Sequence, residues 1–267
     1  MSPSILAFLL CVARLSSVFV SVKFEIPLAQ DENLSHLLDK LMSKEWVERA
    51  AAVGKVLKIP GALQSADVRT ALFDLLDREN RVIEDSFRRG LGVSNEYGEE
   101  YGGYYSAFLG KLSEVADYED KRTLQIFARA SYNPDSPFAR QLAESGQPIV
   151  PIALELLKSD LGWRRVNAIA ILGMVYERRQ VHRLPEESVE LIKQTIVATA
   201  IKDSNSVTRQ TAVEILGRTG TASDLPLLQR IAANDPASYK RGETRRYNVR
   251  EAANEAIAAI RKRTGQK

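Results

Sequence analysis

Apolar residues recur along the chain at the three- and four-residue spacing of one face of an α-helix. Val189, Ile192, Ile196 and Ala200 form one such stripe. From Gln30 onward, no stretch sustains the alternation of apolar and polar residues that is typical of a half-buried β-strand. Short connectors rich in Pro, Gly, Asn and Asp separate the stripes. The pattern predicts an all-α protein of about eleven helices, packed as antiparallel neighbours.

One register recurs three times in the second half of the chain. An Arg is followed by Ala three positions later and by an apolar pair at the sixth and seventh positions, starting at Arg165, Arg209 and Arg250. These arginines are 44 and 41 residues apart, a partial copy begins at Arg122, and an outlying copy begins at Arg49. The Ala allows a neighbouring helix to approach closely, and the Gly after the apolar pair predicts the end of the helix.

A period of this length, with two helices per unit, falls in the HEAT and armadillo range. The segments 203–217 and 249–257 resemble HEAT-like repeats of the short type also found in phycobilisome lyases. The resemblance implies an α-solenoid of antiparallel helix pairs, a HEAT/armadillo-like superhelix that binds partners, and it implies no reaction. In such repeats Asp and Arg bridge neighbouring units and cap helices. Three Asp residues lie five or six positions before repeat arginines and are expected to be N-caps: Asp117, Asp160 and Asp203.

The N-terminal segment differs from the rest of the chain. Residues 5–22 are apolar apart from Arg14 and three serines. Their Ile, Leu, Phe and Val side chains contribute about −5 kcal/mol to membrane insertion, against about +3 kcal/mol for the arginine. We therefore expect an export signal that is cleaved after Ala29 and leaves a secreted or periplasmic protein. The alternatives are a membrane anchor over residues 5–22 and a helix of the core.

Three regions follow from these patterns. Residues 1–29 form the signal peptide or membrane segment, residues 30–116 form a helical region with degenerate repeats, and residues 117–267 hold the HEAT-like repeats. Within the second region, a Gly/Tyr-rich insertion over residues 90–105 interrupts the repeat spacing. Its tyrosines are candidate partner-binding residues, since Tyr is a common contact residue at interfaces. The alternative is that Tyr101 and Tyr105 pack in the core together with Phe108, since these three residues fall at helical spacing. The four candidates are Tyr97, Tyr101, Tyr104 and Tyr105.

The 37 Lys and Arg residues nearly balance the 34 Asp and Glu residues, so the bulk charge does not indicate a nucleic-acid partner. The charge is nevertheless uneven, because residues 74–120 hold 12 acidic and 5 basic residues while residues 237–267 hold 9 basic and 3 acidic residues. Arg245 and Arg246, in the basic segment, are candidates for binding an acidic protein, an anionic lipid or nucleic acid. The alternative is an ordinary solvated cap on the last repeat.

Little in the composition supports catalysis. The single cysteine, Cys11, excludes an internal disulfide framework and a multi-cysteine metal site. The two histidines, His36 and His182, are not followed by Glu, and the sequence contains no common catalytic motif. We expect no metal and no cofactor. The sequence thus favours a non-enzymatic scaffold for a protein or peptide partner. The alternatives are a lyase- or chaperone-type protein with a small ligand in its groove, and nucleic-acid binding, against which export argues.

Overall fold

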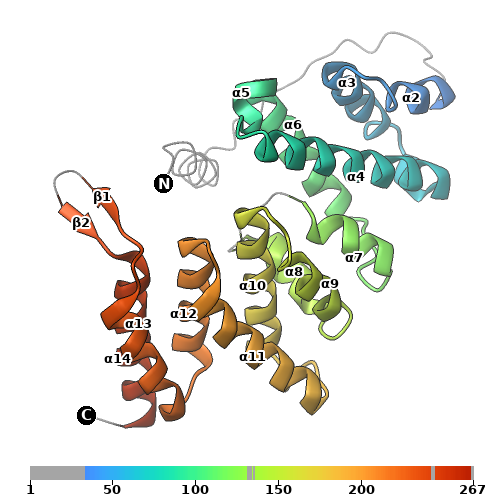
Figure 1. Ribbon diagram of the computed structural model, residues 1–267. Helices are drawn as coiled ribbons and strands as arrows, with labels where there is room; N and C mark the ends of the chain where they lie inside the picture. The colour runs from blue at the N-terminus through green and yellow to red at the C-terminus, as the bar shows by residue number, and fades with distance from the viewer. Residues whose placement is uncertain (1–33, 131–133, 135, 242–243, 266–267) are drawn as a thin grey trace. The chain divides into compact units, whose positions relative to one another are not determined.

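The computed structural model describes residues 34–130, 134, 136–241 and 244–265 (Figure 1). These residues contain thirteen α-helices and a single short hairpin of strands, which confirms the prediction of an all-α protein. Five of these helices are short, with five to eight residues. None of the helices in the described part is both long and apolar enough to cross a membrane. The expected export or anchor segment lies outside the described residues.

The chain divides into two compact units, one through Ala116 and one from Asp117. In unit 1, α2 packs against α3, and α5 packs against α6. The long helix α4 contacts both α5 and α6. The elements of unit 1 are α2 (Leu34–Lys40), α3 (Trp46–Val56), the 3-10 turn η1 (Ala62–Gln64), α4 (Ala66–Arg88), α5 (Val93–Tyr97) and α6 (Glu99–Ser113).

The core of unit 1 changes character along α4. The helix begins after Ser65, whose hydroxyl accepts a hydrogen bond from an amide of the first turn. Its first half buries leucines, including Leu72 and Leu76, whereas its second half buries the polar side chains of Glu79 and Asn80. Buried polar groups need hydrogen-bond partners, and α6 supplies several of them.

Unit 2 is made of helices followed by one hairpin and a last helix. Its elements are α7 (Lys121–Ala128), α8 (Pro137–Glu144), α9 (Ile149–Leu156), α10 (Gly162–Glu177), α11 (Glu186–Lys202), α12 (Ser206–Thr219), the 3-10 turn η2 (Ala222–Asp224), α13 (Leu225–Asn234), β1 (Tyr239–Arg241), β2 (Thr244–Arg246) and α14 (Asn248–Thr264). The two strands pair with each other in antiparallel register. No strand occurs elsewhere in the described residues.

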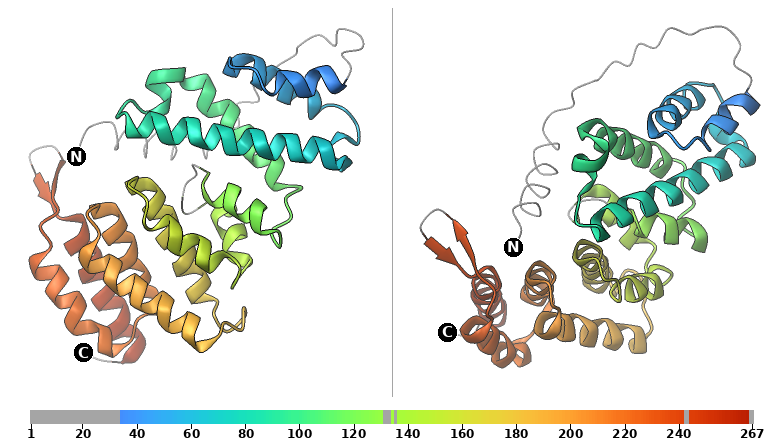
Figure 2. Two further views of the ribbon diagram at one scale, coloured as in Figure 1. Left: turned by 45° about the vertical axis from the view of Figure 1, so that its right-hand side comes forward. Right: turned by 45° about the horizontal axis from the view of Figure 1, so that its top comes forward.

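Helices of unit 2 contact one another in a regular order (Figure 2). One row consists of α8, α10, α12 and α14, each in contact with the next. The helices α9, α11 and α13 pack against this row, with few contacts among themselves. The predicted stripe on α11 faces the row, since Ile192, Ile196 and Ala200 are buried.

The repeated glycines lie inside their helices, so the prediction that they end the helices is wrong. Gly173 lies within α10 and Gly217 within α12. A Cβ atom added to Gly173 would stand 2.5 Å from Cδ1 of Ile215, and one added to Gly217 would stand 3.0 Å from Cα of Ala256. Glycine occupies these positions because the next helix of the row passes too close for a side chain.

The expected N-caps are also wrong for Asp117, Asp160 and Asp203. Asp120 caps α7 instead, and its carboxylate accepts a hydrogen bond of 2.6 Å from the amide of the third helical residue. That bond lowers the pKa of Asp120. Asn205 caps α12, while the residue before α10 provides no side-chain cap. Asp203 is not an N-cap, and its carboxylate instead accepts hydrogen bonds from the side chain of Arg165.

Candidate functional site

Two of the four candidate tyrosines are core residues. Tyr101 and Tyr105 are 0% and 3% exposed, so they present no side-chain surface to a partner. The Tyr101 hydroxyl donates to the Glu79 carboxylate at 2.6 Å, and the Tyr105 hydroxyl donates to the Asn80 side chain at 2.6 Å. These two residues therefore pack in the core, where their hydroxyls supply hydrogen bonds to the buried polar side chains of α4. Phe108, one turn further, is buried with them.

The other two tyrosines are half-buried in an aromatic cluster. Tyr104 stacks on Phe108 at 5.9 Å between ring centroids and on Trp46 of α3 at 6.2 Å. Tyr97 lies 5.1 Å from the ring of Tyr101. Burial, and then the nearby negative charge of Glu79, raise the pKa of Tyr104 far above its ordinary value, so its hydroxyl stays protonated. These side chains join α3 to α6 and leave only partial surface for a partner.

Three arginines make one set of contacts, which we call the arginine staple. Arg49, Arg165 and Arg209 each donate from Nη1 to the carbonyl oxygens five and six residues earlier, at 2.7–3.5 Å. Each also donates from Nε and Nη2 to both oxygens of one carboxylate, at 2.6–3.0 Å. The carboxylates belong, in that order, to Glu79, Asp203 and Asp235.

The ion pairs of the three staples are largely buried. Burial by itself would raise the pKa of Asp235, but the hydrogen bonds from Arg209 and from the amide of Ala237 outweigh burial and lower it. In each staple, the arginine side chain binds backbone carbonyls of the loop before its own helix. It thereby links that loop to a carboxylate that lies later in the chain. These charges are therefore committed to structural contacts.

Arg245 and Arg246 lie on β2, where both are exposed. Arg246 pairs with Glu251 of α14 through two hydrogen bonds of 2.8 and 2.7 Å. Arg245 stands opposite Lys240 of β1 in the register of the hairpin. The sequence pattern did not predict this hairpin, because each strand has only three residues.

An open groove, which the sequence analysis does not predict, lies between α9 and α11. Its volume is about 440 Å³. Leu154, Leu157 and Ala198 give it an apolar lining, and Lys158 and Lys202 stand beside them. Threonine side chains and one staple carboxylate complete the lining: Thr195, Thr199 and Asp203. An apolar centre with charged groups around it is the usual anatomy of a protein-binding surface.

The spacing along α11 was the available signal for this groove. Leu191, Thr195, Ala198 and Lys202 follow one another at intervals of four, three and four residues, and so share a helix face. That face lies beside the buried stripe, and Leu191 is 47% exposed. Only the stronger, fully apolar stripe was recognised in the sequence.

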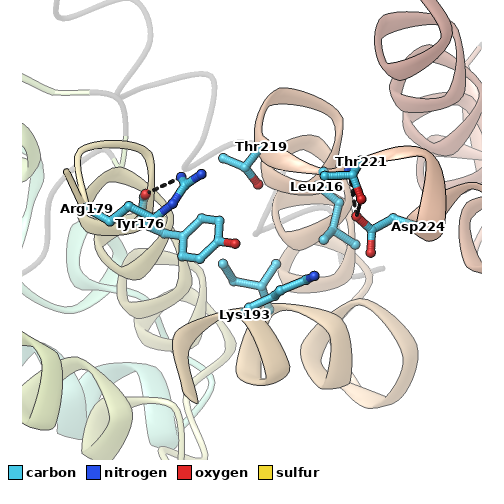
Figure 3. Close-up of a pocket in the computed structure, with 9 residues that line it drawn as sticks. Tyr176, Arg179, Lys193, Leu216, Thr219, Thr221 and Asp224 are labelled. Carbon is cyan, nitrogen blue, oxygen red and sulfur yellow. Dashed lines mark hydrogen bonds between the residues drawn. The ribbon is translucent and has the colours of Figure 1, made fainter. Parts of the chain in front are cut away.

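A second, smaller cavity of about 60 Å³ lies where α10, α11, α12 and η2 meet (Figure 3). Arg179 stacks over the ring of Tyr176 at 4.5 Å, and the carboxylate of Asp224 accepts a bond of 2.7 Å from the amide of Thr221. The volume is well below the 300–1,000 Å³ of typical small-molecule sites. It suits about two water molecules.

His182 packs in the loop between α10 and α11. Its ring lies against Gly146, where an added Cβ would stand 3.0 Å from Nδ1. Burial and, after it, the charge of Arg178 lower the pKa of His182. Within the described residues, no three His, Cys, Asp or Glu side chains gather in a way that would hold a metal ion. The sequence matches no protein-family model and no curated protein.

Proposed function

We propose that the chain is an exported, non-enzymatic scaffold of HEAT-like repeats that binds a protein or peptide partner in the groove between α9 and α11. The observation that carries this proposal is the groove itself. Its apolar lining is open to solvent, and Lys202 beside it forms no ion pair with a carboxylate of the described residues. A partner segment with apolar side chains and an acidic flank fits this chemistry.

The contacts of unit 2 support the α-solenoid part of the proposal. The row of α8, α10, α12 and α14 repeats one helix-to-helix contact, and glycine recurs at the closest approach. The staple recurs at Arg165 and Arg209, which occupy the same position of the sequence register. Arg49 makes the same contacts in unit 1, which supports a degenerate repeat there.

The shape of the groove supports a polypeptide occupant over a small-molecule ligand. A lyase or chaperone for a small molecule needs a concave site that encloses most of its ligand. The groove is shallow and open to solvent, and the cavity near Tyr176 and Asp224 is too small for an organic ligand. We therefore prefer an elongated polypeptide to a small molecule as the occupant.

Site-specific photo-cross-linking in the native cells tests the proposal. A photoreactive residue at position 198 is expected to capture one polypeptide, and the same residue at Ala233, exposed on α13, is the control. Replacing Leu157→Asp should abolish capture from position 198 without unfolding the protein. Equal capture from both positions, or capture of no polypeptide from position 198, would refute groove binding.

The export part needs a separate measurement, since residues 1–33 lie outside the described part of the structure. We expect a soluble species outside the cytoplasm that is about 29 residues shorter than the translated chain. Its mass in fractionated native cells decides the matter. A full-length species in the membrane would favour the anchor over residues 5–22, and a full-length cytoplasmic species would contradict both.

A further inference from the structure

The hairpin of β1 and β2 is an insertion in the staple pattern. Asp203 and Asp235 are equivalent, because each follows the last residue of a helix and accepts both bonds of a staple arginine. The backbone carbonyl of each accepts a bond from the next register arginine, Arg209 at 2.7 Å and Arg250 at 2.6 Å. The first arginine follows its aspartate by six residues and the second by fifteen. The second segment is therefore nine residues longer than the first, yet the hydrogen bond from the arginine to the aspartate carbonyl is kept.

The added residues form a projecting ribbon that the helices do not require. The hairpin extends away from α13 and α14 (Figures 1 and 2). A two-stranded ribbon is marginally stable in water on its own, and its outer edges leave backbone N–H and C=O groups unpaired. The insertion therefore carries an energetic cost that the helical packing does not explain.

Its charges add to this cost. Lys240 and Arg245 are directly opposite each other in the register, and both are exposed. Like charges at opposite positions destabilise a strand pair. Neither side chain forms an ion pair within the part of the chain that the structure describes, whereas Arg246 is neutralised by Glu251. An anionic partner would relieve the repulsion between these two cations.

We infer that this hairpin binds an extended acidic polypeptide segment, which adds as a third strand along an edge of the ribbon. The backbone edge supplies hydrogen bonds, and the cations at positions 240 and 245 pair with carboxylates of the segment. Because side chains alternate between faces along a strand, the segment carries its Asp or Glu residues at every second position. This surface is separate from the groove between α9 and α11, and the inference goes beyond the proposed function.

Synthetic peptides and the purified protein test the inference. The probes are fluorescent octapeptides with Glu and Thr in alternation, with the same residues in two blocks, and with Lys and Thr in alternation. Anisotropy titrations should give the alternating Glu peptide at least tenfold higher affinity than the blocked peptide, and no binding of the Lys peptide. Amide exchange of residues 239–241 and 244–246 should slow in the complex, as expected for a third strand.

Two charge-matched variants locate the site. Lys240→Glu with Arg245→Glu should lower the affinity at least tenfold, while Arg261→Glu with Lys262→Glu, near the end of α14, should change it less than twofold. Circular dichroism checks that both variants stay folded. Equal losses in both variants, or equal affinity for the alternating and blocked peptides, would overturn the inference in favour of bulk charge.

The same titrations include a double-stranded DNA oligonucleotide and anionic phospholipid vesicles. Binding of either one without the alternating peptide would overturn the inference and assign the hairpin to that polyanion. Binding of no probe would also overturn it, and would leave the cations as protection of the strand edges against aggregation.

Discussion

Replacing Gly173→Ala tests how closely α10 and α12 approach. The new Cβ would stand 2.5 Å from Cδ1 and 2.7 Å from Cγ1 of Ile215, a side chain that is fully buried. Contacts this short require either Ile215 to leave its position or the two helices to separate. In contrast, Gly110 lies in α6 with no atom within 4 Å of an added Cβ, so Gly110→Ala is the matched control.

The magnitude follows from two opposing terms. Ala stabilises a helix interior by about 1 kcal/mol relative to Gly. Overpacking a tight core costs about 1–3 kcal/mol. We expect Gly173→Ala to be between neutral and about 2 kcal/mol destabilising, and Gly110→Ala to be stabilising by about 1 kcal/mol. For unit 2, which spans residues 117–267, 1 kcal/mol corresponds to a change of roughly 2–4 °C in Tm.

Urea unfolding followed by tryptophan fluorescence separates the two units, because unit 1 contains Trp46 and unit 2 contains Trp163. Single-tryptophan backgrounds report each transition alone. Ile215→Ala should cost less in the Gly173→Ala protein than in the unmodified protein, since it removes the atoms that clash. If Gly173→Ala stabilises unit 2 as much as Gly110→Ala stabilises unit 1, the close approach of the helices is refuted.

Further expectations concern the buried charges and the histidine. Glu79→Ala leaves the buried Arg49 guanidinium without its carboxylate and should destabilise unit 1 by about 3–5 kcal/mol in urea unfolding; an effect below 1 kcal/mol would contradict the buried pair. Tyr101→Phe removes one hydrogen bond to that carboxylate and should cost about 1.5–3 kcal/mol in the same assay. Because folding lowers the pKa of His182 below 6.5, its contribution is present above that pH and is lost as the pH falls through the lower folded value. The stability of unit 2 should therefore decline as the pH falls below about 6.5, and His182→Gln should flatten that decline; an unchanged slope would exclude the histidine as its source.

The sequence predicted the features that depend on spacing. Helical periodicity identified the stripe around Ile192 and placed Tyr101 and Phe108 on one helix face, and all three are buried. The Arg register identified Arg165 and Arg209 before any contact was known. Spacing was informative in these cases because helix geometry alone brings such residues together.

Features that depend on tertiary contacts could not be predicted. Glu79 is charged and in mid-helix, which normally indicates a solvated face, and only the partners from α3 and α6 explain its burial. The role of Gly173 was misread as a helix end, because the sequence does not reveal which atoms of the next helix approach it. Spacing along α11 could place Thr195 and Ala198 on one helix face, but the groove also needs residues from α9, and their distance from α11 is a tertiary feature.

We expect a polypeptide partner to occupy the groove between α9 and α11. Methyl NMR of the purified protein, titrated with the polypeptide captured by cross-linking, reports on this occupancy. We predict that the methyl signals of Leu154, Leu157 and Ala198 shift together and saturably, while those of Leu72 and Leu76 in the core of unit 1 do not. Saturable binding that leaves the three groove methyls unchanged would contradict the account.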